Sequence, residues 1–278
     1  MKRLCKWLFR FVLLMIIIGG CSFVMAKSTG NINIVIVGID TREGVEGARS
    51  DTIMLAHIDA QHEQAKLVSI PRDAYVYIPK VDYEDKINHA YAFGGLDGLL
   101  TTLNTLFDQK FTYYVEVDFL KMIKLIDTID GIMLTPSSSF CEMNEKDIAN
   151  AFCFEEDVEV AMNGEQALAY ARHRKSDNDL YRVTRQQEVV KAMITKVKKS
   201  NPVTVYRFYR KFQKISNTNL EFQEFIKYSD LLYNGFSLTQ DVAQGYSDTV
   251  YSPIYNQYIS YFFLDDEWLT QMQNELRK

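Results

Sequence analysis

Short apolar runs rich in β-branched and aromatic residues alternate along this chain with segments of helical apolar spacing. The apolar runs predict β-strands at Asn31–Val37, Ile53–Ile58, Gln64–Ile70, Tyr113–Val117 and Ile132–Thr135. The helical spacing predicts helices at Leu96–Phe107 and Phe119–Ile129. This rhythm of strand, helix and strand predicts an α/β fold, an α-β-α sandwich with a mixed central sheet.

Local capping signals define the elements of the second half. Asn163 and Gln166 have the spacing of a capping box, which predicts a helix directly after Asn163. Asp179 can cap the next helix, and Pro202 can open a third helix that runs through Ile215. A further helix is expected at Leu220–Tyr233.

The tyrosine-rich segment Val250–Phe263 is expected to include a late strand. Its aromatic residues are more typical of a buried core than of a surface that stacks on sugars.

The N-terminus predicts where the chain works. Its basic residues have no acidic counterparts: Lys2, Arg3, Lys6 and Arg10. They precede the unbroken apolar run Phe11–Ile18, which predicts an export signal or membrane anchor within residues 1–27. Either a lipobox-like sequence leads to cleavage and lipid attachment at Cys21, or Phe11–Ala26 remains as a short spanning helix. The positive charges stay inside, so residues 28–278 are expected outside the cytoplasm.

The charge balance limits the class of partner. The chain has 278 residues, enough for one large domain or at most two, and a formal net charge of −5. An acidic protein with a local arginine cluster suits a small polyanion in a pocket better than a long nucleic acid, which favours broad basic surfaces. We therefore expect no nucleic-acid partner.

Two cysteines, Cys141 and Cys153, lie in the exported part and flank an acidic, irregular segment. An export context permits a disulfide, but two free buried thiols are also compatible with the sequence. No cysteine or histidine spacing is typical of a zinc site, and no Ser-His-Asp pattern is evident.

Charged residues stand where the predicted strands begin and end. Asp40 and Arg42 follow the first strand, Asp51 precedes the second, and Arg72 and Asp73 follow the third. Hard divalent cations prefer oxygen ligands, and guanidinium groups match phosphate oxygens. The pattern predicts a site for a divalent cation and a phosphate, while Asx turns with surface ion pairs are the alternative interpretation.

The densest cationic cluster lies within residues 163–187. Its members are Arg172, Arg174, Lys175, Arg182 and Arg185. Arg182 and Gln186 are one helical turn apart near the predicted helix start at Asp179, and helix N-termini favour anions. The cluster predicts a binding site for a multiply charged anion; the alternative is a basic loop beside a solvated helix face.

A polar loop precedes Lys86–Tyr91, and Gly94–Gly95 predicts a flexible turn before the next helix. His89 is expected to be a hydrogen-bonded structural residue, because no other histidine stands at metal-ligand spacing.

An ordered set of motifs spans residues 31–199. It comprises Gly38-x-Asp40-x-Arg42, Arg49-Ser50-Asp51-Thr52, Ser69-Ile70-Pro71-Arg72-Asp73, Lys86-Ile87-Asn88-His89-Ala90-Tyr91, Asn163-Gly164-x-x-Ala167-Leu168-x-Tyr170-x-Arg172-x-Arg174 and Arg182-x-x-Arg185-Gln186. In this order the motifs resemble those of the LytR-CpsA-Psr family. Residues 200–278 lie beyond the resemblance and would form a C-terminal extension of the same catalytic domain.

The resemblance implies a fold and an activity. The family fold is an α-β-α sandwich that encloses an apolar tunnel for a polyprenyl chain. Its members are membrane-anchored, extracytoplasmic phosphotransferases of Gram-positive-type envelopes. They move an anionic glycopolymer, such as wall teichoic acid or capsule, from a polyprenyl pyrophosphate carrier to a peptidoglycan hydroxyl.

The resemblance also implies residue roles. Asp40 and Asp51 would hold Mg²⁺. The pyrophosphate would be bound by Arg42, Arg72, Arg172, Arg174, Arg182 and Gln186. Supporting roles would fall to Arg49, Lys86, Asn88 and Arg185. The short N-terminal region departs from the family pattern, and a lipidated Cys21 would be an unusual anchor.

Phosphoryl-type transfer requires little covalent chemistry from the protein, so positioning and charge neutralisation should dominate. Arg72 is the expected catalytic cation, and Asp73 or Asp51 would take the proton of the acceptor hydroxyl. Two rival hypotheses remain: a non-catalytic envelope protein that binds polyprenyl phosphate or anionic polymer, and a lipid pyrophosphate hydrolase.

Overall fold

A mixed six-stranded sheet forms the centre of the computed structural model, which describes residues 30–40, 49–144, 148–173, 179–221, 224 and 237–277. The strands, in sheet order, are β11 (Asn217–Thr218), β6 (Tyr113–Asp118), β1 (Ile32–Asp40), β2 (Arg49–Asp59), β3 (Gln64–Ile70) and β12 (Ser237–Val242). β2 runs antiparallel to β1 and β3, whereas β6 and β12 run parallel to β1 and β3 respectively. The predicted mixed sheet is confirmed.

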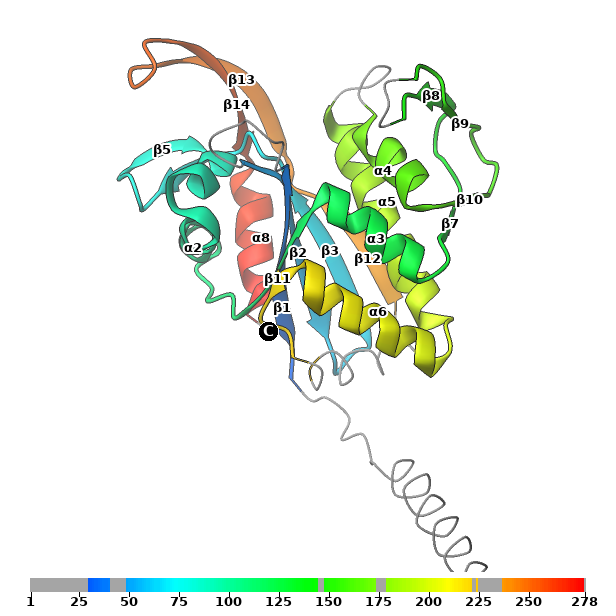
Figure 1. Cartoon of the computed structure of the whole chain (residues 1–278). Helices are drawn as coiled ribbons and strands as arrows, with labels where there is room; N and C mark the ends of the chain where they lie inside the picture. The colour runs from blue at the N-terminus through cyan, green and yellow to red at the C-terminus, as the bar shows by residue number, and fades with distance from the viewer. Residues whose placement is uncertain are drawn as a thin grey trace, which may run out of the picture.

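Helices cover both faces of this sheet (Figure 1). One face carries α2 (Ile87–Phe107) and α8 (Asp266–Leu276), and the other carries α3 (Phe119–Thr128), α4 (Gly164–Arg172), α5 (Asp179–Lys198) and α6 (Pro202–Ile215). Each helical layer has its own apolar core, one around Leu99 and Trp268 and the other around Ile126 and Val189. The α-β-α sandwich predicted from the sequence is therefore confirmed.

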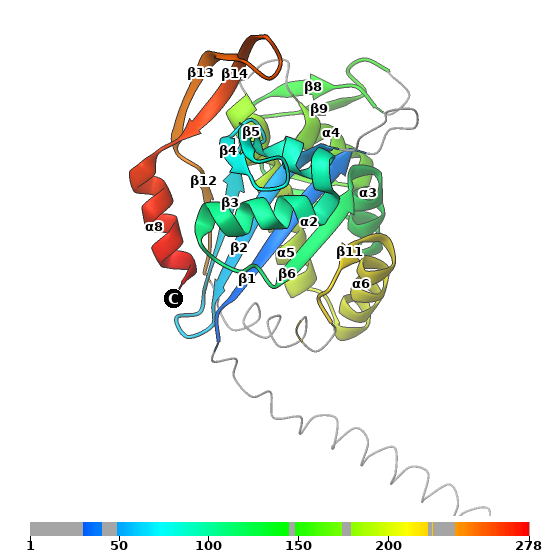
Figure 2. The same ribbon diagram turned by 90° about the vertical axis from the view of Figure 1, so that its left-hand side faces the viewer.

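Small two-stranded sheets surround the central one. They are β4 (Tyr75–Ile78) with β5 (Tyr83–Lys86), β7 (Ile132–Leu134) with β10 (Val160–Met162), β8 (Phe140–Glu142) with β9 (Phe152–Phe154), and β13 (Gly245–Ser252) with β14 (Gln257–Leu264). The β8–β9 and β13–β14 pairs lie at the same end of the molecule in both views (Figures 1 and 2). Most of these strands have only three or four residues, too few for a clear alternating pattern.

The strand ends nearest the charged motifs differ from the prediction. Instead of giving way to a loop at Gly38, β1 continues to Asp40, which pairs with Arg49. The register shifts between Gly38 and Ile39, so that Asp51 is the extra residue of a β-bulge in β2. The predictions that Asp40 follows the first strand and that Asp51 precedes the second are therefore wrong, because backbone pairing extends both strands beyond their apolar runs.

The turn predicted at Gly94–Gly95 is confirmed as a break in helical conformation at Gly95, whereas the helical residues from Ile87 onward were not predicted. α2 begins at Ile87 and passes through both glycines with a kink at Gly95, where φ is 61° and ψ is −154°. Glycine adopts this positive φ at little steric cost, so the helical conformation is interrupted at Gly95 and the chain bends there.

The helices predicted from capping residues are confirmed for α4 and α6. Gln166 N donates to Asn163 Oδ1 at 2.9 Å and Asn163 N donates to Gln166 Oε1 at 3.0 Å, which confirms the capping box of α4. α6 has the bounds that Pro202 and Ile215 predict. Most of the helix expected at Leu220–Tyr233 lies outside the described residues.

Cys141 and Cys153 are joined by a disulfide. They are register partners in the β8–β9 pair, so the bond links neighbouring strands of one hairpin. The structure therefore selects the disulfide from the two states that the sequence allowed.

The predicted anchor in residues 1–27 lies outside the described residues. Within the described ranges, the helices are too short or too polar to cross a membrane.

Candidate functional site

The turn that follows β3 brings Arg72 against Asp51. Ile53 pairs with Ile70 across antiparallel strands, so the chain beyond Ile70 runs back alongside the residues before Ile53. Arg72 Nη1 lies 2.7 Å from Asp51 Oδ1, and both side chains are about three-quarters buried. The antiparallel register thus joins two of the predicted site residues.

Asp73 and Lys86 continue this charged group. Lys86 Nζ donates to Asp73 Oδ1 at 2.7 Å, and Arg72 Nε lies 3.7 Å from Asp73 Oδ2. β4 and β5 hold the lysine there, because Tyr75 pairs with Lys86. The backbone N–H of Asn88, whose side chain is buried, donates to the carbonyl of Arg72 at 3.2 Å. The start of α2 therefore supports the turn that carries Arg72 and Asp73. We refer to Asp51, Arg72, Asp73 and Lys86 as the turn cluster.

Gln186 reaches the sheet from α5. Thr52 Oγ1 donates to Gln186 Oε1 at 2.9 Å. Because Thr52 follows Asp51 in β2, this hydrogen bond links Gln186, a predicted anion ligand, to the strand that carries Asp51. Both side chains border a small apolar pocket of about 50 Å³ between the sheet and the helices, lined also by Ile36, Gly38, Met54, Val117, Met122, Ala171 and Val190. The pocket lies where an apolar tunnel was expected, but this volume holds only a fragment of a lipid chain.

The two arginines of α5 are buried. Arg182 is 3% exposed, and Arg185 is 1% exposed. Arg185 Nη2 donates to the backbone carbonyl of His173 at 2.8 Å, and its guanidinium carbon lies 5.2 Å from the centre of the Phe140 ring. Arg185 therefore joins α5 to the end of α4, and its supporting role in the site stays a prediction.

Residues around His173 were missed by the sequence analysis. The buried His173 ring stacks on Phe140 with ring centres 3.9 Å apart, and its Nδ1 lies 2.9 Å from Glu142 Oε2. Phe140 and Glu142 flank Cys141, so the disulfide-linked hairpin packs directly on the end of α4. The position of His173 between two arginines was the available signal. We refer to Arg185, His173, Phe140 and Glu142 as the junction cluster.

The structure describes only some of the remaining predicted site residues. Arg172 is the last residue of α4 and its side chain is exposed. Arg42 and Arg174 lie outside the described residues, as do the side chains of Asp40 and Arg49. Their predicted roles stay predictions.

His89 is hydrogen-bonded, as expected. Its Nδ1 lies 2.7 Å from Oδ2 of the fully buried Asp85, which also accepts a hydrogen bond from Tyr255 in the β13–β14 turn at 2.7 Å. Burial of Asp85 acts to raise its pKa, but the hydrogen bonds from His89, Tyr255 and the Lys86 backbone outweigh burial, so the pKa is lowered. Burial and the same hydrogen bond raise the pKa of Tyr255. Asp85 thus connects β5 to a distant hairpin.

The donor set around the bulge is compatible with Mg²⁺, although it forms no cage of protein ligands. Among the described residues, no group of three or more His, Cys, Asp or Glu side chains is arranged to hold a metal. Mg²⁺ commonly takes one or two carboxylates and completes its coordination with water and substrate phosphates. Asp51 is the described carboxylate that fits this pattern, and Arg72 already occupies one of its oxygens.

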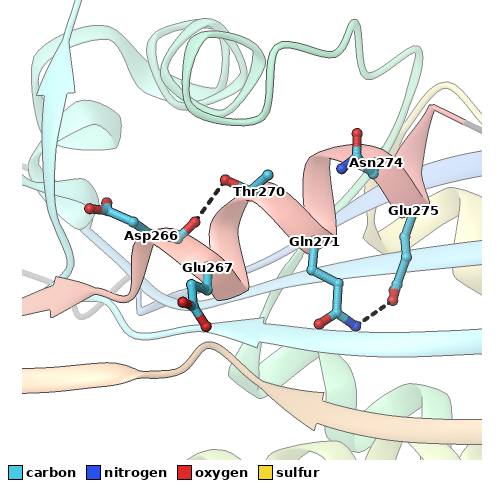
Figure 3. Close-up of a pocket in the computed structure, with 6 residues that line it drawn as sticks. All are labelled: Asp266, Glu267, Thr270, Gln271, Asn274 and Glu275. Atoms are coloured by element: carbon cyan, nitrogen blue, oxygen red, sulfur yellow. Dashed lines mark hydrogen bonds between the residues drawn. The ribbon is translucent and has the colours of Figure 1, made fainter.

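A larger hollow of about 590 Å³ runs along α8 (Figure 3). All the residues that line it come from one helix: Asp266, Glu267, Thr270, Gln271, Asn274 and Glu275. Glu275 accepts hydrogen bonds from Gln271 and from Lys66 of β3, both at 2.8 Å. We assign no function to this surface, because the groups at its end are used to fasten α8 to the sheet.

Comparison with known proteins identifies what this chain resembles. The model of the LytR_cpsA_psr family matches residues 19–278, which is nearly the whole chain. The polyisoprenyl-teichoic acid–peptidoglycan teichoic acid transferase TagT of Bacillus subtilis (strain 168) is 36% identical over 179 residues, which is 63% of this chain and 55% of TagT. The chain therefore matches just over half the length of that relative.

Two further comparisons extend over more of the chain. The polyisoprenyl-teichoic acid–peptidoglycan teichoic acid transferase TagU of Enterococcus faecalis (strain ATCC 700802 / V583) is 30% identical over 90% of this chain and 82% of TagU. A solved structure of TagT bound to LIIa-WTA superposes with a TM-score of 0.73 and 29% identity, and covers 89% of each chain. The similarity thus includes the layered fold as well as the amino-acid sequence.

Proposed function

The chain belongs to the LytR_cpsA_psr family, and from this we propose that it is a phosphotransferase of the cell envelope. It moves an anionic glycopolymer, such as wall teichoic acid or capsule, from a polyprenyl pyrophosphate carrier to a peptidoglycan hydroxyl. The observation that carries this proposal is the contact of Arg72 Nη1 with Asp51 at 2.7 Å, because Thr52, the next residue of β2, lines the apolar pocket. A charged group next to an apolar space suits a ligand with a diphosphate head and a hydrocarbon tail.

Arg72 is suited to hold the diphosphate. Its planar guanidinium presents several N–H donors that match phosphate oxygens, and it lies beside the carboxylates of Asp51 and Asp73. Gln186 would add an amide beside the sheet, while Arg172 stands exposed at the end of α4. Arg42, Arg174 and the buried Arg182 complete the cations that we propose for the pyrophosphate.

The reaction forms one bond between oxygen and phosphorus and breaks another. The acceptor hydroxyl oxygen attacks the phosphorus that bears the glycan, and polyprenyl phosphate leaves with the electrons of the broken P–O bond. Asp73 is positioned by Lys86 at 2.7 Å and is our first candidate to accept the hydroxyl proton, with Asp51 as the alternative. Mg²⁺ bound at Asp51 and Asp40 would neutralise charge on the pyrophosphate oxygens.

We further propose that the chain works outside the cytoplasm and is attached to the membrane through residues 1–27. The basic residues before the apolar run Phe11–Ile18 support this orientation. A reporter enzyme fused after Lys278 should be active only when it is exported. Activity of a cytoplasm-specific reporter would contradict this placement.

Transfer itself is testable with the full chain in detergent micelles. Supplied with Mg²⁺, a polyprenyl pyrophosphate-linked glycopolymer and peptidoglycan oligomers, it should release polyprenyl phosphate and form a covalent polymer–peptidoglycan product, detected by mass spectrometry. Release of free glycan phosphate at a rate independent of peptidoglycan would instead identify a hydrolase. Donor binding without either product would identify a non-catalytic binding protein.

A further inference from the structure

The β13–β14 hairpin is the largest feature of this fold to which the proposed reaction assigns no role. It extends beyond the central sheet and reaches over β5 and the start of α2 (Figure 1). Its strands pair over eight residues each, from Gly245 with Leu264 to Ser252 with Gln257. The expectation that this tyrosine-rich segment is mainly core is wrong for several of its rings, which are exposed.

The two faces of the hairpin have different environments. Tyr261 faces the body of the protein, is 2% exposed and packs edge-on against Tyr75 with ring centres 4.8 Å apart. Side chains alternate between faces along a strand, so Tyr251 and Tyr258, which are cross-strand partners, lie on the opposite face. They are 50% and 74% exposed, and their rings lie 5.6 Å apart. The outward face thus presents a pair of tyrosine rings to solvent.

The hairpin directly contacts residues of the turn cluster. Phe262 N donates to the carbonyl of Asp73 at 2.9 Å, and Lys86 Nζ lies 5.7 Å from the centre of the Tyr261 ring. At the other end of the hairpin, Tyr255 donates to the buried Asp85, which immediately precedes Lys86. Both ends are therefore attached to the segments that carry Asp73 and Lys86, the residues proposed to meet the acceptor.

The chemistry of the outward face selects the kind of partner. Between Gly245 and Leu264 the sequence contains no Lys, Arg, His or Glu, and Asp248 is the one charged residue. Thr249 pairs with Ser260 beside the tyrosine rings, and both are exposed. Flat aromatic faces with neighbouring hydroxyls suit uncharged sugars, whose C–H faces are apolar and whose hydroxyls need hydrogen-bond partners.

We propose that the outward face of the β13–β14 hairpin, centred on Tyr251 and Tyr258, binds the neutral N-acetylated sugar backbone of the acceptor glycan. It would hold the acceptor glycan on a hairpin that is attached to the segments carrying Asp73 and Lys86. The anionic donor polymer fits this face less well, because the hairpin offers no cation to its phosphates. An anionic membrane surface fits poorly for the same reason, since surface-binding segments rely on Lys and Arg. This inference rests on the proposed transfer to peptidoglycan.

The test compares a double variant, Tyr251→Ser with Tyr258→Ser, with the control Tyr206→Ser, which removes a tyrosine that is 50% exposed on α6. The full chain in detergent micelles is incubated with peptidoglycan sacculi stripped of attached polymer, and separately with chitotetraose. Loss of two ring faces should weaken binding to both probes about tenfold, whereas the control binds like the unmodified chain.

The kinetics give an independent readout. In the transfer assay the double variant should raise KM for peptidoglycan about tenfold, with kcat at saturating acceptor and the affinity for the lipid-linked donor unchanged. Unchanged binding to sacculi would overturn the inference. Two further outcomes would also overturn it. If the double variant loses affinity only for vesicles of phosphatidylglycerol and phosphatidylcholine, the face binds a membrane. If the unmodified chain sediments as a dimer and the double variant as a monomer, the face binds a second copy of the chain.

Failure of the proposed function looks different. If the unmodified chain binds sacculi through the tyrosine pair but forms no product with any donor, the transferase proposal fails while the glycan surface stands. If product forms and the double variant binds and reacts normally, the surface proposal fails alone.

Discussion

The turn cluster and the junction cluster use the same side chain, arginine, in different environments. Arg72 in the turn cluster is about a quarter exposed and is paired with the carboxylate of Asp51. Arg185 in the junction cluster is fully buried and binds a backbone carbonyl and an aromatic face. The first arrangement keeps part of a guanidinium exposed to solvent, whereas the second fixes two helices relative to each other.

The difference shows why a count of arginines is a poor guide to a binding site. A partly exposed ion pair contributes little to stability, because water and salt screen it, and its charge can be redirected to a ligand. A buried guanidinium must keep its partners, because removing them leaves polar groups unsatisfied in an apolar environment. We therefore expect Arg72 to affect transfer and Arg185 to affect folding.

The largest effect is expected for Arg72→Ala. Loss of the guanidinium should lower kcat for polymer transfer by about 100-fold to 1,000-fold, as for other preorganised donors that act on developing charge. The unfolding free energy should change by no more than about 1 kcal/mol, since the pair with Asp51 is partly exposed. Denaturant unfolding and the transfer assay measure the two quantities on the same preparation.

Arg72→Lys is the informative companion, because it keeps the charge and loses the planar fork. We expect it to recover only a small part of the lost activity. An Arg72→Ala variant that transfers polymer within tenfold of the unmodified rate would remove Arg72 from the reaction.

The next largest effect is expected for Arg185→Ala. It removes the donor to the His173 carbonyl and leaves a cavity beside Phe140, so the unfolding free energy should fall by about 3 kcal/mol. The matched control is Arg207→Ala on the exposed side of α6, with an expected change within about 0.5 kcal/mol. A stable Arg185→Ala variant with abolished donor binding would instead mean that this buried arginine contacts the substrate.

A smaller effect is expected for Thr52→Val, which lies between the two clusters. The variant keeps the shape of the side chain but loses the hydrogen bond to Gln186, at a cost of about 1 kcal/mol in thermal unfolding. Thr52→Ser keeps the hydroxyl and should stay close to the unmodified protein. Equal stability of all three would indicate that the contact between β2 and α5 does not hold Gln186 in place.

The smallest effect is a dependence of stability on pH at Asp85, beside the turn cluster. Its pKa in the fold lies below the ordinary value of 3.8, so the ionised form stabilises the folded state. That contribution is fully present above pH 3.8 and is lost as the pH falls through the lowered value. The difference in melting temperature between the unmodified chain and Asp85→Asn should therefore narrow on acidification from about pH 5 to about pH 3. A constant difference over that range would assign the stabilisation to another group.

The sequence by itself determined the features that depend on neighbouring residues. Asn163 and Gln166 are close enough in the chain to cap α4 whatever surrounds them, and Pro202 opens α6 because its ring suits the first turn of a helix. The strands β1, β2 and β3 are each buried against a helical layer, so their sequences are runs of apolar residues. These runs predict strands from the sequence alone. These signals were sufficient for the α-β-α sandwich.

Only the tertiary structure decided which side chains meet. Asp51 contacts Arg72 because of the antiparallel register of β2 and β3 and a β-bulge at Asp51, which the residue pattern does not predict. Gln186 reaches Thr52 across 134 residues, and Tyr255 reaches Asp85 across 170. Composition likewise could not separate buried from exposed tyrosines in the β13–β14 hairpin. Such contacts depend on how distant elements pack, and that packing is a property of the whole chain rather than of any one segment.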